Sequence, residues 1–476
     1  MEKKLNLLFI FADQWRRSAV GFAKADPVHT PNIDRFAARS FVFTNAVSAC
    51  PLCSPHRASL LTGRQPLSTG VFTNCKTGLS MRLNDDEICI SDVLHNRGYK
   101  TAYIGKWHLD EPEGNNSSQP RSGAERWDAY TPPGPRRHGF EMWHSYGAWD
   151  DHLHPHYWEN SPEKIRVNQW SPEHETDTAI GWIGKQTDPF CLFMSWNPPH
   201  SPYSEVPEKY LKLYDPRSLP LRSNVLTGNI HQHTGEEMPM DELELRRTTC
   251  QYYAAVSGLD EQFGRIIQTL KDKDLLDSTV VVLSSDHGDM MGSHGLMAKH
   301  VWHEESIGIP LVIGGAGIQP GTGGTVTGSA DMMPTLLSLL GQPIPDTVEG
   351  EDCSASLKGI MDREKSCLIA TCPGRDIFLK EFAGAGMDPR SSGWRALRTE
   401  GYTYVVDAGY SPVARRPLTR LLYDLKNDPF QMHPSVFTRS SLRGNANSFE
   451  QELRDLLIKY NDPFMERFSQ EPQQQD

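Results

Sequence analysis

Four near-continuous apolar runs, each followed by polar residues, constrain the fold of this chain more than any other feature. They are "LNLLFIF" before Asp13, "YKTAYIG" before Lys106, "FCLFMSW" before Asn197 and "STVVVLSS" before Asp286. Runs of this kind are typical of parallel strands buried on both faces. In such sheets the residues that follow the strands gather at one edge. We therefore predict an α/β fold, a mostly parallel sheet sandwiched by helices, with a site at the carboxyl edge.

The C-terminal quarter follows a different pattern. The segments "WRALRTEGYTYVV" and "RLLYDLKNDP" resemble strands of an antiparallel unit, and a charged amphipathic helix is predicted near residues 448–460. A chain of 476 residues is long enough for one large domain and a smaller one. We predict a large domain over residues 1–365 and a C-terminal α+β subdomain over residues 366–476; the family resemblance of the motifs below implies that the first is catalytic and that the second contributes to the substrate pocket.

Charge and hydropathy exclude some classes of protein. The 48 Lys and Arg against 60 Asp and Glu give a net charge of -12, which argues against a nucleic-acid partner. No apolar run approaches the roughly 20 residues of a membrane span. The eight residues from Leu5 to Ala12 are too short for a secretion signal and lack a cleavage site, so a buried strand is predicted there. The chain as given is expected to be cytoplasmic, or periplasmic or secreted if a leader was removed. Oligomerisation is left open.

The stretch "CPLCSPHRASLLTGR", residues 50–64, allows several interpretations. Nine cysteines, an odd number without regular spacing, argue against a disulfide framework. Cys50 and Cys53 form the only C-x-x-C, which admits a redox pair, but no second pair exists to complete a zinc site. Ser54 suits a helix cap, Pro55 the first helical position and Gly63 the residue past the helix end. Cys53 would then lie immediately before a helix N-terminus, which favours negative charge.

The run C-x-P-x-R followed by "ASLLTGR" resembles the motif of type I sulfatases. Four more segments resemble that family in the same order: "TPNIDRFAARSFVFTNAV", "GKWHL", "NPPHSPY" and "SSDHGDMMGSHGLMAKH". The resemblance implies an alkaline-phosphatase-like fold. It also implies that a maturation enzyme oxidises Cys53 to formylglycine, and that a hydroxyl of the hydrated aldehyde attacks the sulfur of a sulfate ester.

The resemblance also implies a role for each matching residue. The catalytic residues are Cys53, Arg57, Lys106, His108, His200 and Lys299, and the metal ligands are Asp13, Gln14, Cys53, Asp286 and His287. Arg57 and Lys106 would stabilise oxyanions, His200 or Lys299 would protonate the leaving alcohol, and His108 would take a proton when sulfate is expelled. A ligand set rich in oxygen suits Ca²⁺. The His287 imidazole adds a nitrogen ligand, so Mg²⁺ or Mn²⁺ is also compatible with the set.

Two of these assignments carry a geometric condition. Lys106 and His108 are two apart, so in an extended segment they face the same side. Asp286 and His287 are consecutive and would point to opposite faces of a strand, so a turn past the strand end, which Gly288 permits, is needed for both to reach one ion.

One departure from the family pattern concerns substrate. The family commonly has two adjacent aspartates after the first strand, whereas this chain has Asp13 and Gln14, which leaves the site one charge more positive. We expect a sulfatase acting on a carbohydrate sulfate, with a phosphonate monoester or phosphodiester hydrolase as the alternative. A third hypothesis is a non-catalytic or redox protein in which Cys53 stays unconverted or pairs with Cys50.

Other polar and aromatic residues remain open to more than one interpretation. His152, His154 and His156 occupy alternate positions beside Asp150 and Asp151, which allows a second metal site, a pocket wall or a polar loop. A further set could contact an anionic saccharide or be solvated or buried: Arg136, Arg137, Arg395, Trp149, Trp158 and Trp394.

Overall fold

A large, mostly parallel sheet forms the centre of the molecule. The computed structural model describes residues 4–231, 237–359, 364–412 and 417–471. In spatial order the eight strands are β13 (Gly321–Gly323), β2 (Phe41–Phe43), β12 (Val312–Gly314), β10 (Thr279–Ser285), β1 (Asn6–Asp13), β7 (Phe190–Pro199), β3 (Lys100–Lys106) and β4 (Met142–Tyr146). Only β12 runs antiparallel to its neighbours within this sheet. The predicted mostly parallel sheet is confirmed.

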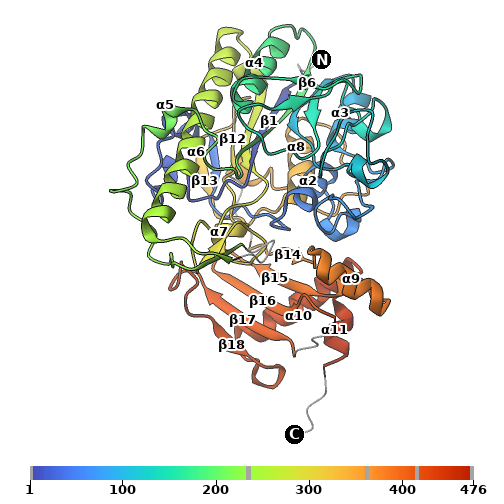
Figure 1. The fold of residues 1–476 in the computed structure, drawn as a ribbon, viewed down its shortest axis with the longest axis vertical. Helices are drawn as coiled ribbons and strands as arrows, with labels where there is room; N and C mark the ends of the chain where they lie inside the picture. Colours follow the sequence, from blue (N-terminus) through green and yellow to red (C-terminus); the bar gives the residue numbers. More distant parts are fainter. Residues whose placement is uncertain (1–3, 232–236, 360–363, 413–416, 472–476) are drawn as a thin grey trace.

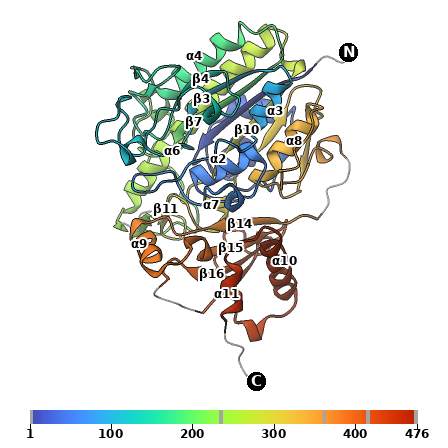
Figure 2. The same cartoon turned by 90° about the vertical axis from the view of Figure 1, so that its right-hand side faces the viewer.

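Helices cover both faces of this sheet (Figures 1 and 2). They are α1 (Pro31–Ala37), α4 (Ser171–Ile183), α5 (Glu208–Leu211) and α6 (Glu242–Asp272) on one side, and α2 (Cys53–Thr62), α3 (Ile90–Asn96) and α8 (Met332–Leu339) on the other. The strand β1 shows why: Leu8 and Ile10 join the core under α4 and α6, whereas Leu7 and Phe9 join the core under α2 and α8. Within the described ranges, every helix is too short or too polar to serve as a membrane span.

The long helix α6 differs from its sequence interpretation. Helical spacing of apolar residues indicated a helix from about Tyr252 to Leu276, but α6 starts at Glu242 and ends at Asp272. The Asp241 side chain caps it by accepting a hydrogen bond from the Glu244 amide. Its first two turns are largely exposed and polar, so apolar periodicity could not reveal them.

The C-terminal unit is a separate antiparallel sheet below the carboxyl edge of the large sheet (Figure 1). Its strands in spatial order are β14 (Cys367–Thr371), β15 (Gly393–Arg398), β16 (Tyr402–Gly409), β17 (Thr419–Asp424) and β18 (Ser435–Phe437). Its helices are α9 (Asp376–Ala385), α10 (Asn445–Lys459) and α11 (Met465–Ser469). The predicted C-terminal antiparallel sheet is confirmed, whereas a division at residue 365 stays a prediction. Two small sheets complete the fold: β5 (His156–Tyr157) with β6 (Ile165–Arg166), and β11 (Leu296–Met297) with β8 (Asn229–His231) and β9 (Glu237–Met238).

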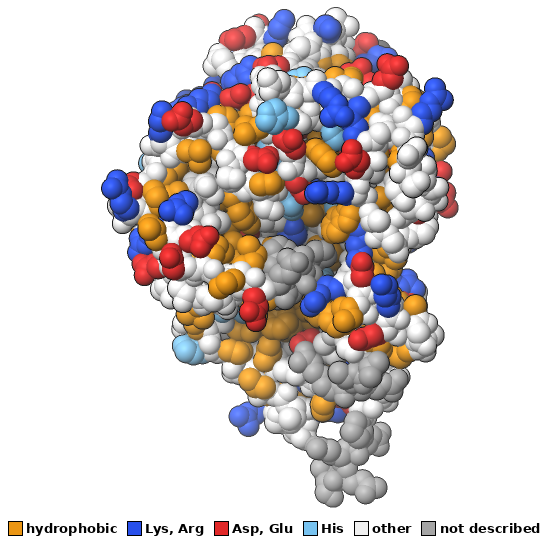
Figure 3. All heavy atoms as spheres, viewed as in Figure 1, with side chains coloured by type: hydrophobic (Ala, Val, Ile, Leu, Met, Phe, Trp, Pro, Cys, Tyr) orange, Lys and Arg blue, Asp and Glu red, His pale blue; other side chains and the backbone are white. Residues whose placement is uncertain are grey.

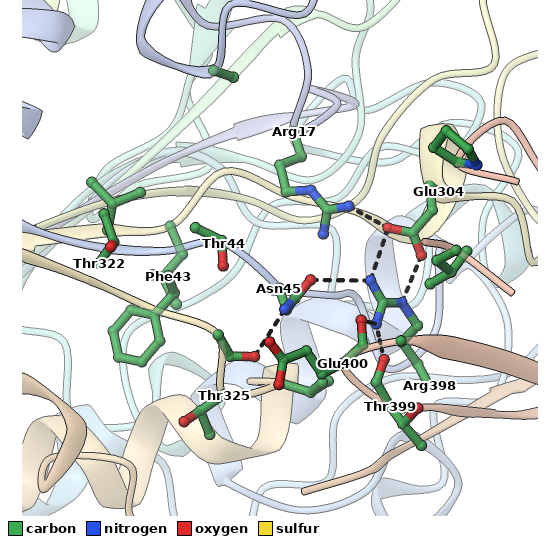
Figure 4. A pocket seen from close by; sticks show the side chains of 18 of the residues that line it. Arg17, Phe43, Thr44, Asn45, Glu304, Thr322, Thr325, Arg398, Thr399 and Glu400 are labelled. Atoms are coloured by element: carbon green, nitrogen blue, oxygen red, sulfur yellow. Dashed lines mark hydrogen bonds and ion pairs between the residues drawn. The ribbon is translucent and has the colours of Figure 1, made fainter. Parts of the chain in front are cut away.

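The two units meet around a half-buried carboxylate. Viewed from the side used in Figure 1, hydrophobic side chains show between charged ones where the units join (Figure 3). Beside this junction lies a cavity of about 1500 Å³, in which Glu304 of α7 (Glu304–Ile307) accepts hydrogen bonds from Arg17 of the large unit and Arg398 of β15 (Figure 4). Burial raises the pKa of Glu304, but the two guanidiniums outweigh it and hold the pKa at about 2. The carboxylate is therefore charged at neutral pH and links the units.

Candidate active site

Helix α2 places Cys53 at the edge of the large sheet. Cys53 is the first residue of the helix rather than the residue before it, and Leu52 is the N-cap. Ser54, predicted to cap the helix, instead donates its hydroxyl to the His108 carbonyl (2.7 Å) and accepts from the Cys75 amide (3.1 Å). Ser54 thus joins the helix start to two loops. Gly63 ends the helix in the left-handed conformation, as predicted.

Four buried side chains surround one point. The Cys53 Sγ lies 3.3 Å from His287 Nε2 and 3.6 Å from Asp13 Oδ1, and Nε2 lies 3.6 Å from Asp286 Oδ1. One ligand atom of each of the four residues falls within 4.8 Å of the others. Two carboxylates that are 0% exposed, beside an imidazole nitrogen, form a donor set that fits a divalent cation.

The turn after β10 brings the last two ligands together. The strand ends at Ser285, and Asp286 and His287 follow it, so the condition set by the sequence is met. His287 Nδ1 faces the Gly288 carbonyl at 3.0 Å, which leaves Nε2 to face the cluster. A Cβ at Gly288 would lie 2.0 Å from the Glu305 carbonyl oxygen, so the turn requires glycine for close approach.

Two cations compensate the carboxylates. Arg57 Nη2 lies 3.0 Å from Asp13 and 3.0 Å from Asp286, and Lys106 Nζ lies 2.8 Å from Asp13. Burial disfavours the charged forms of Asp13 and Lys106, but their ion pairs outweigh it. Lys106, His200 and Arg57 hold the pKa of Asp13 well below its usual range. The pKa of Lys106 is raised, chiefly by Asp13. Both side chains are therefore charged at neutral pH.

Gln14 contacts the cluster differently from an acidic ligand. Its Oε1 accepts a hydrogen bond from Lys299 Nζ, while its Nε2 donates to Asp289 Oδ2 (2.6 Å) and to the Tyr203 hydroxyl (3.1 Å). These donors and acceptors fix which way the amide points. Asp289 is 0% exposed and lies one contact farther from the cluster than Gln14. Its carboxylate provides the negative charge that the Gln14 amide lacks.

His108 lies beside Lys106, but not through an extended segment. The strand β3 ends at Lys106, and His108 adopts the left-handed conformation with φ 54. Its Nε2 lies 3.1 Å from the Cys75 carbonyl oxygen. Burial, followed by Lys106 and Arg57, lowers the pKa of His108 well below its usual value, so the ring is neutral. If Nε2 donates to Cys75, Nδ1 is free to accept a proton.

His200 is the most accessible of the predicted catalytic residues. It follows the two prolines at the end of β7, and its side chain is 15% exposed, whereas Cys53 is 1% exposed. Its Nδ1 lies 2.8 Å from the Ser201 carbonyl oxygen and 3.4 Å from Asp150 Oδ1. The histidine therefore lies at the mouth of the site.

Three buried polar residues of the site were not assigned from the sequence. Ser195 accepts a hydrogen bond from Arg57 Nη1 (2.6 Å), Asn197 accepts one from Lys106 Nζ (3.0 Å), and Asp289 accepts one from Gln14. The strand-end rule indicated the position of Asn197 without a role for it, and Ser195, two residues earlier in the same apolar run, could have been found with it.

The three alternate histidines do not converge on a second metal site. Their partners are the carbonyl of His200 for His152 (2.8 Å), Asp151 for His154 (3.3 Å) and Asp128 for His156 (2.7 Å). His152 and His154 lie in a polar loop, as one interpretation expected, whereas His156 belongs to β5; His152 and His156 are buried.

The arginines and tryptophans left open from the sequence have partners within the protein or are wholly or partly buried. Arg136 pairs with Asp110 (2.7 Å), Arg137 donates to the Thr131 carbonyl (2.9 Å) and Arg395 pairs with Asp462 (2.6 Å). Trp158 and Trp394 are buried, whereas Trp149 is half-buried with Lys164 over its ring. Arg395 in particular is neither solvated nor available to a saccharide.

The described cysteines form neither a disulfide nor a metal-binding group of two cysteines. All nine lie in the described part of the chain, buried and without a disulfide there. Cys50 takes no part in the ligand group around Cys53. The pKa of Cys50 is raised by burial and by its neighbour Cys372. A zinc half-site at the C-x-x-C is therefore not seen.

A mostly parallel sheet with this cluster at its carboxyl edge defines an alkaline-phosphatase-like hydrolase. A profile of the Sulfatase family matches residues 5–342. The chain is 34% identical to an endo-4-O-sulfatase of Bacteroides thetaiotaomicron, over 96% of this chain and 93% of that protein. It is 33% identical to an ulvan-active sulfatase of Formosa agariphila, over 98% and 83% of the two chains.

A solved structure gives the same result. A Bacteroides thetaiotaomicron protein, described under the metabolism of multiple glycosaminoglycans, superposes with a TM-score of 0.84 at 32% identity over 98% of both chains. The chain belongs to the sulfatase family, and it is a sulfuric ester hydrolase.

Proposed function

We propose that this sulfatase hydrolyses sulfate monoesters of a carbohydrate, using formylglycine made from Cys53 and a divalent cation. The position of Cys53 carries the proposal: its Sγ lies within 3.6 Å of both Asp13 and His287, at the start of a buried helix. Burial, followed by Asp13, raises the pKa of the thiol to about 12. An unconverted Cys53 would be protonated and a weak nucleophile, which favours its conversion by a maturation enzyme.

The residues around Cys53 suit a sulfate group. The ester carries a negative charge that spreads over its oxygens as sulfur is attacked, and fixed cations stabilise that charge best in a buried site. Arg57, Lys106 and Lys299 would bind these oxygens. Asp13, Asp286 and His287 would hold the cation, with Gln14 adjacent. The hydrated formylglycine supplies the hydroxyl nucleophile, and the ion, for which Ca²⁺ fits the oxygen ligands best, supplies further positive charge.

Two histidines would move protons. As the ester S–O bond breaks, its electron pair goes to the leaving oxygen, and His200 would give that oxygen a proton. His200 is favoured over Lys299 for this role because Lys299 donates to Gln14 in the interior, whereas His200 lies at the mouth. His108, neutral and buried, would then accept the proton whose removal expels sulfate.

The carbohydrate is proposed from two relatives. One is named for endo-4-O-sulfatase activity and the other for activity on ulvan, and each aligns with more than nine-tenths of this chain. The alternative, a phosphonate monoester or phosphodiester hydrolase, rests on Gln14 replacing an acidic residue. Parallel assays with 4-nitrophenyl sulfate, phenyl phosphonate and phosphodiester substrates separate the two. A hundredfold or greater preference for the phosphorus esters would overturn the proposal.

Mass spectrometry of the peptide containing residues 50–64 tests the nucleophile directly. In protein made together with a maturation enzyme, we expect formylglycine at position 53, and we expect Cys53→Ala to abolish turnover while keeping the melting temperature. A complete Cys50–Cys53 disulfide in that protein, or retained activity of Cys53→Ala, would contradict the mechanism. Dialysis against a chelator, followed by addition of Ca²⁺, Mg²⁺ or Mn²⁺, identifies the ion that restores activity.

A further inference from the structure

A chain of polar contacts runs from the buried cations to the mouth of the site through Asn197. The pairing of β1 with β7 shifts here, because Ala12 pairs with Trp196 but Asp13 pairs with Pro199. Asn197 lies in this irregular segment and is 0% exposed. An irregularity of this kind re-aims side chains beside a site.

The Asn197 amide has only one orientation that satisfies its neighbours. Its Oδ1 accepts a hydrogen bond from Lys106 Nζ at 3.0 Å. Its Nδ2 donates to Asp150 Oδ1 at 3.0 Å and to the Trp149 carbonyl at 2.8 Å. A cation on one side and two acceptors on the other fix the amide, so Asn197 holds the Asp150 carboxylate in place.

Asp150 in turn faces one nitrogen of His200. Its Oδ1 lies 3.4 Å from His200 Nδ1, and the Ser201 carbonyl oxygen lies 2.8 Å from the same nitrogen. Two oxygen acceptors at Nδ1 favour a proton on that atom. The second proton of the imidazolium is then carried by Nε2, the nitrogen that remains to serve a ligand.

We propose that Asp150 and Asn197 are positioning residues for His200, and this inference rests on the proposed function. Asp150 holds the ring with Nε2 toward the leaving oxygen, and Asn197 holds Asp150. The proton on Nε2 passes to the leaving oxygen as that oxygen takes the electron pair of the S–O bond. An oxygen that is stable as an anion does not need this proton, so the pair matters only for poor leaving groups.

The experiment compares two sulfate esters that differ in leaving group. For Asp150→Asn in the matured, metal-loaded enzyme, we expect kcat for phenyl sulfate to fall about 10- to 100-fold, and kcat for 4-nitrophenyl sulfate to fall about threefold or less. A merely structural role would reduce both alike. Equal losses for the two esters, or no loss for either, would overturn the inference.

A neighbouring carboxylate gives a matched control. Asp151 accepts from the His154 amide at 2.8 Å and pairs with the exposed His154 ring instead of the site. Asp151→Asn should therefore leave kcat for both esters within about twofold, since surface substitutions away from such contacts have small effects.

Two further variants test the order of the contacts. Asn197→Asp replaces an amide donor with a carboxylate facing Asp150, so the same selective loss on phenyl sulfate is expected. In the His200→Gln background, adding Asp150→Asn should cause no further loss, because residues that act through one another are not additive. A further tenfold loss in that background would contradict the inference. Asp150 is 47% exposed, so Asp150→Asn should fold, which its melting temperature checks. If wild type hydrolyses neither ester, the proposed function itself fails and this inference with it.

Discussion

Two fully buried arginines, Arg57 in the large unit and Arg395 in the small one, use their guanidiniums differently. Arg395 directs Nε and Nη2 to the two oxygens of Asp462 at 2.6 and 2.8 Å, and its other bonds go to backbone carbonyls, including that of Thr371, and to the Cys372 sulfur. Arg57 reaches two carboxylates at 3.0 Å each, Asp13 at the end of β1 and Asp286 just after β10, and its buried Nε has no hydrogen-bond partner among the described residues. Arg395 forms a closed pair, whereas Arg57 belongs to an open cluster.

The difference shows that a buried charge alone does not indicate function. A bidentate pair with one carboxylate satisfies both partners and leaves nothing to bind. A cation shared between carboxylates, beside further cations, is arranged to meet an anion that arrives later. Both arginines are equally inaccessible, so only their hydrogen-bond partners distinguish them.

The largest expected effect follows from removing the open arginine. Arg57→Met should lower kcat for 4-nitrophenyl sulfate at least about 10³-fold, because a charge aimed at the sulfate oxygens is lost. Asp13 keeps its ion pair with Lys106, but Asp286 loses its cation, so a lower melting temperature is also expected and kcat is measured on the folded fraction. Arg57→Lys should not rescue turnover, since one ammonium cannot replace a fork that serves two carboxylates. A loss of kcat below tenfold would indicate that Arg57, like Arg395, has a structural role only.

The second effect concerns stability. Arg395→Met leaves the Asp462 carboxylate buried without a cation, which should lower the free energy of unfolding by about 3 kcal/mol. Chemical denaturation measures it, and the folded fraction should keep the wild-type kcat. Adding Asp462→Leu should recover part of the stability, because the uncompensated charge is then gone. If Arg395→Met kept the wild-type stability but had impaired turnover, the roles given to the two arginines would be reversed.

The smallest effect uses a third charge, at the junction of the units. Glu304 has a folded pKa of about 2 against an ordinary value of 4.5. Its stabilisation is therefore complete above about pH 4.5 and is lost as the pH falls toward 2. Glu304→Gln should lower the free energy of unfolding by about 1–2 kcal/mol at pH 7. Plotted against pH, the free energies of unfolding of wild type and variant should converge below pH 4. Glu400→Gln, an exposed carboxylate of the same cavity, is the control. If the free energies of unfolding of wild type and Glu304→Gln differed by the same amount down to pH 2, the stabilising role given to the Glu304 charge would be wrong.

The sequence predicted the sheet and the ends of its strands because continuous apolar runs have few other structures to adopt. Asp13 and Asp286 could be placed for that reason. The spacing from Cys53 to Arg57 fitted a helix, although its start was misplaced: Ser54 has the residue type of a cap, but two distant loops claim its hydroxyl.

The remaining errors concern partners far away in the chain. The contacts of Gln14 with Tyr203 and Asp289 span 189 and 275 residues. Those of Arg395 and His156 likewise depend on carboxylates whose positions only the fold determines. No local pattern distinguishes an arginine in a closed pair from one exposed to solvent.

The position of β1 in the middle of the sheet has a consequence for biosynthesis. This apolar strand is made first, yet one of its neighbours is β10, about 270 residues later in the chain. At about 5–20 residues per second, translation from Cys53 to Asp286 takes roughly 10–50 s, during which the site cannot close. Cys53, only 1% exposed afterwards, is open to a modifying enzyme in that interval. The same delay leaves a hydrophobic strand without its β10 partner while the chain is being made.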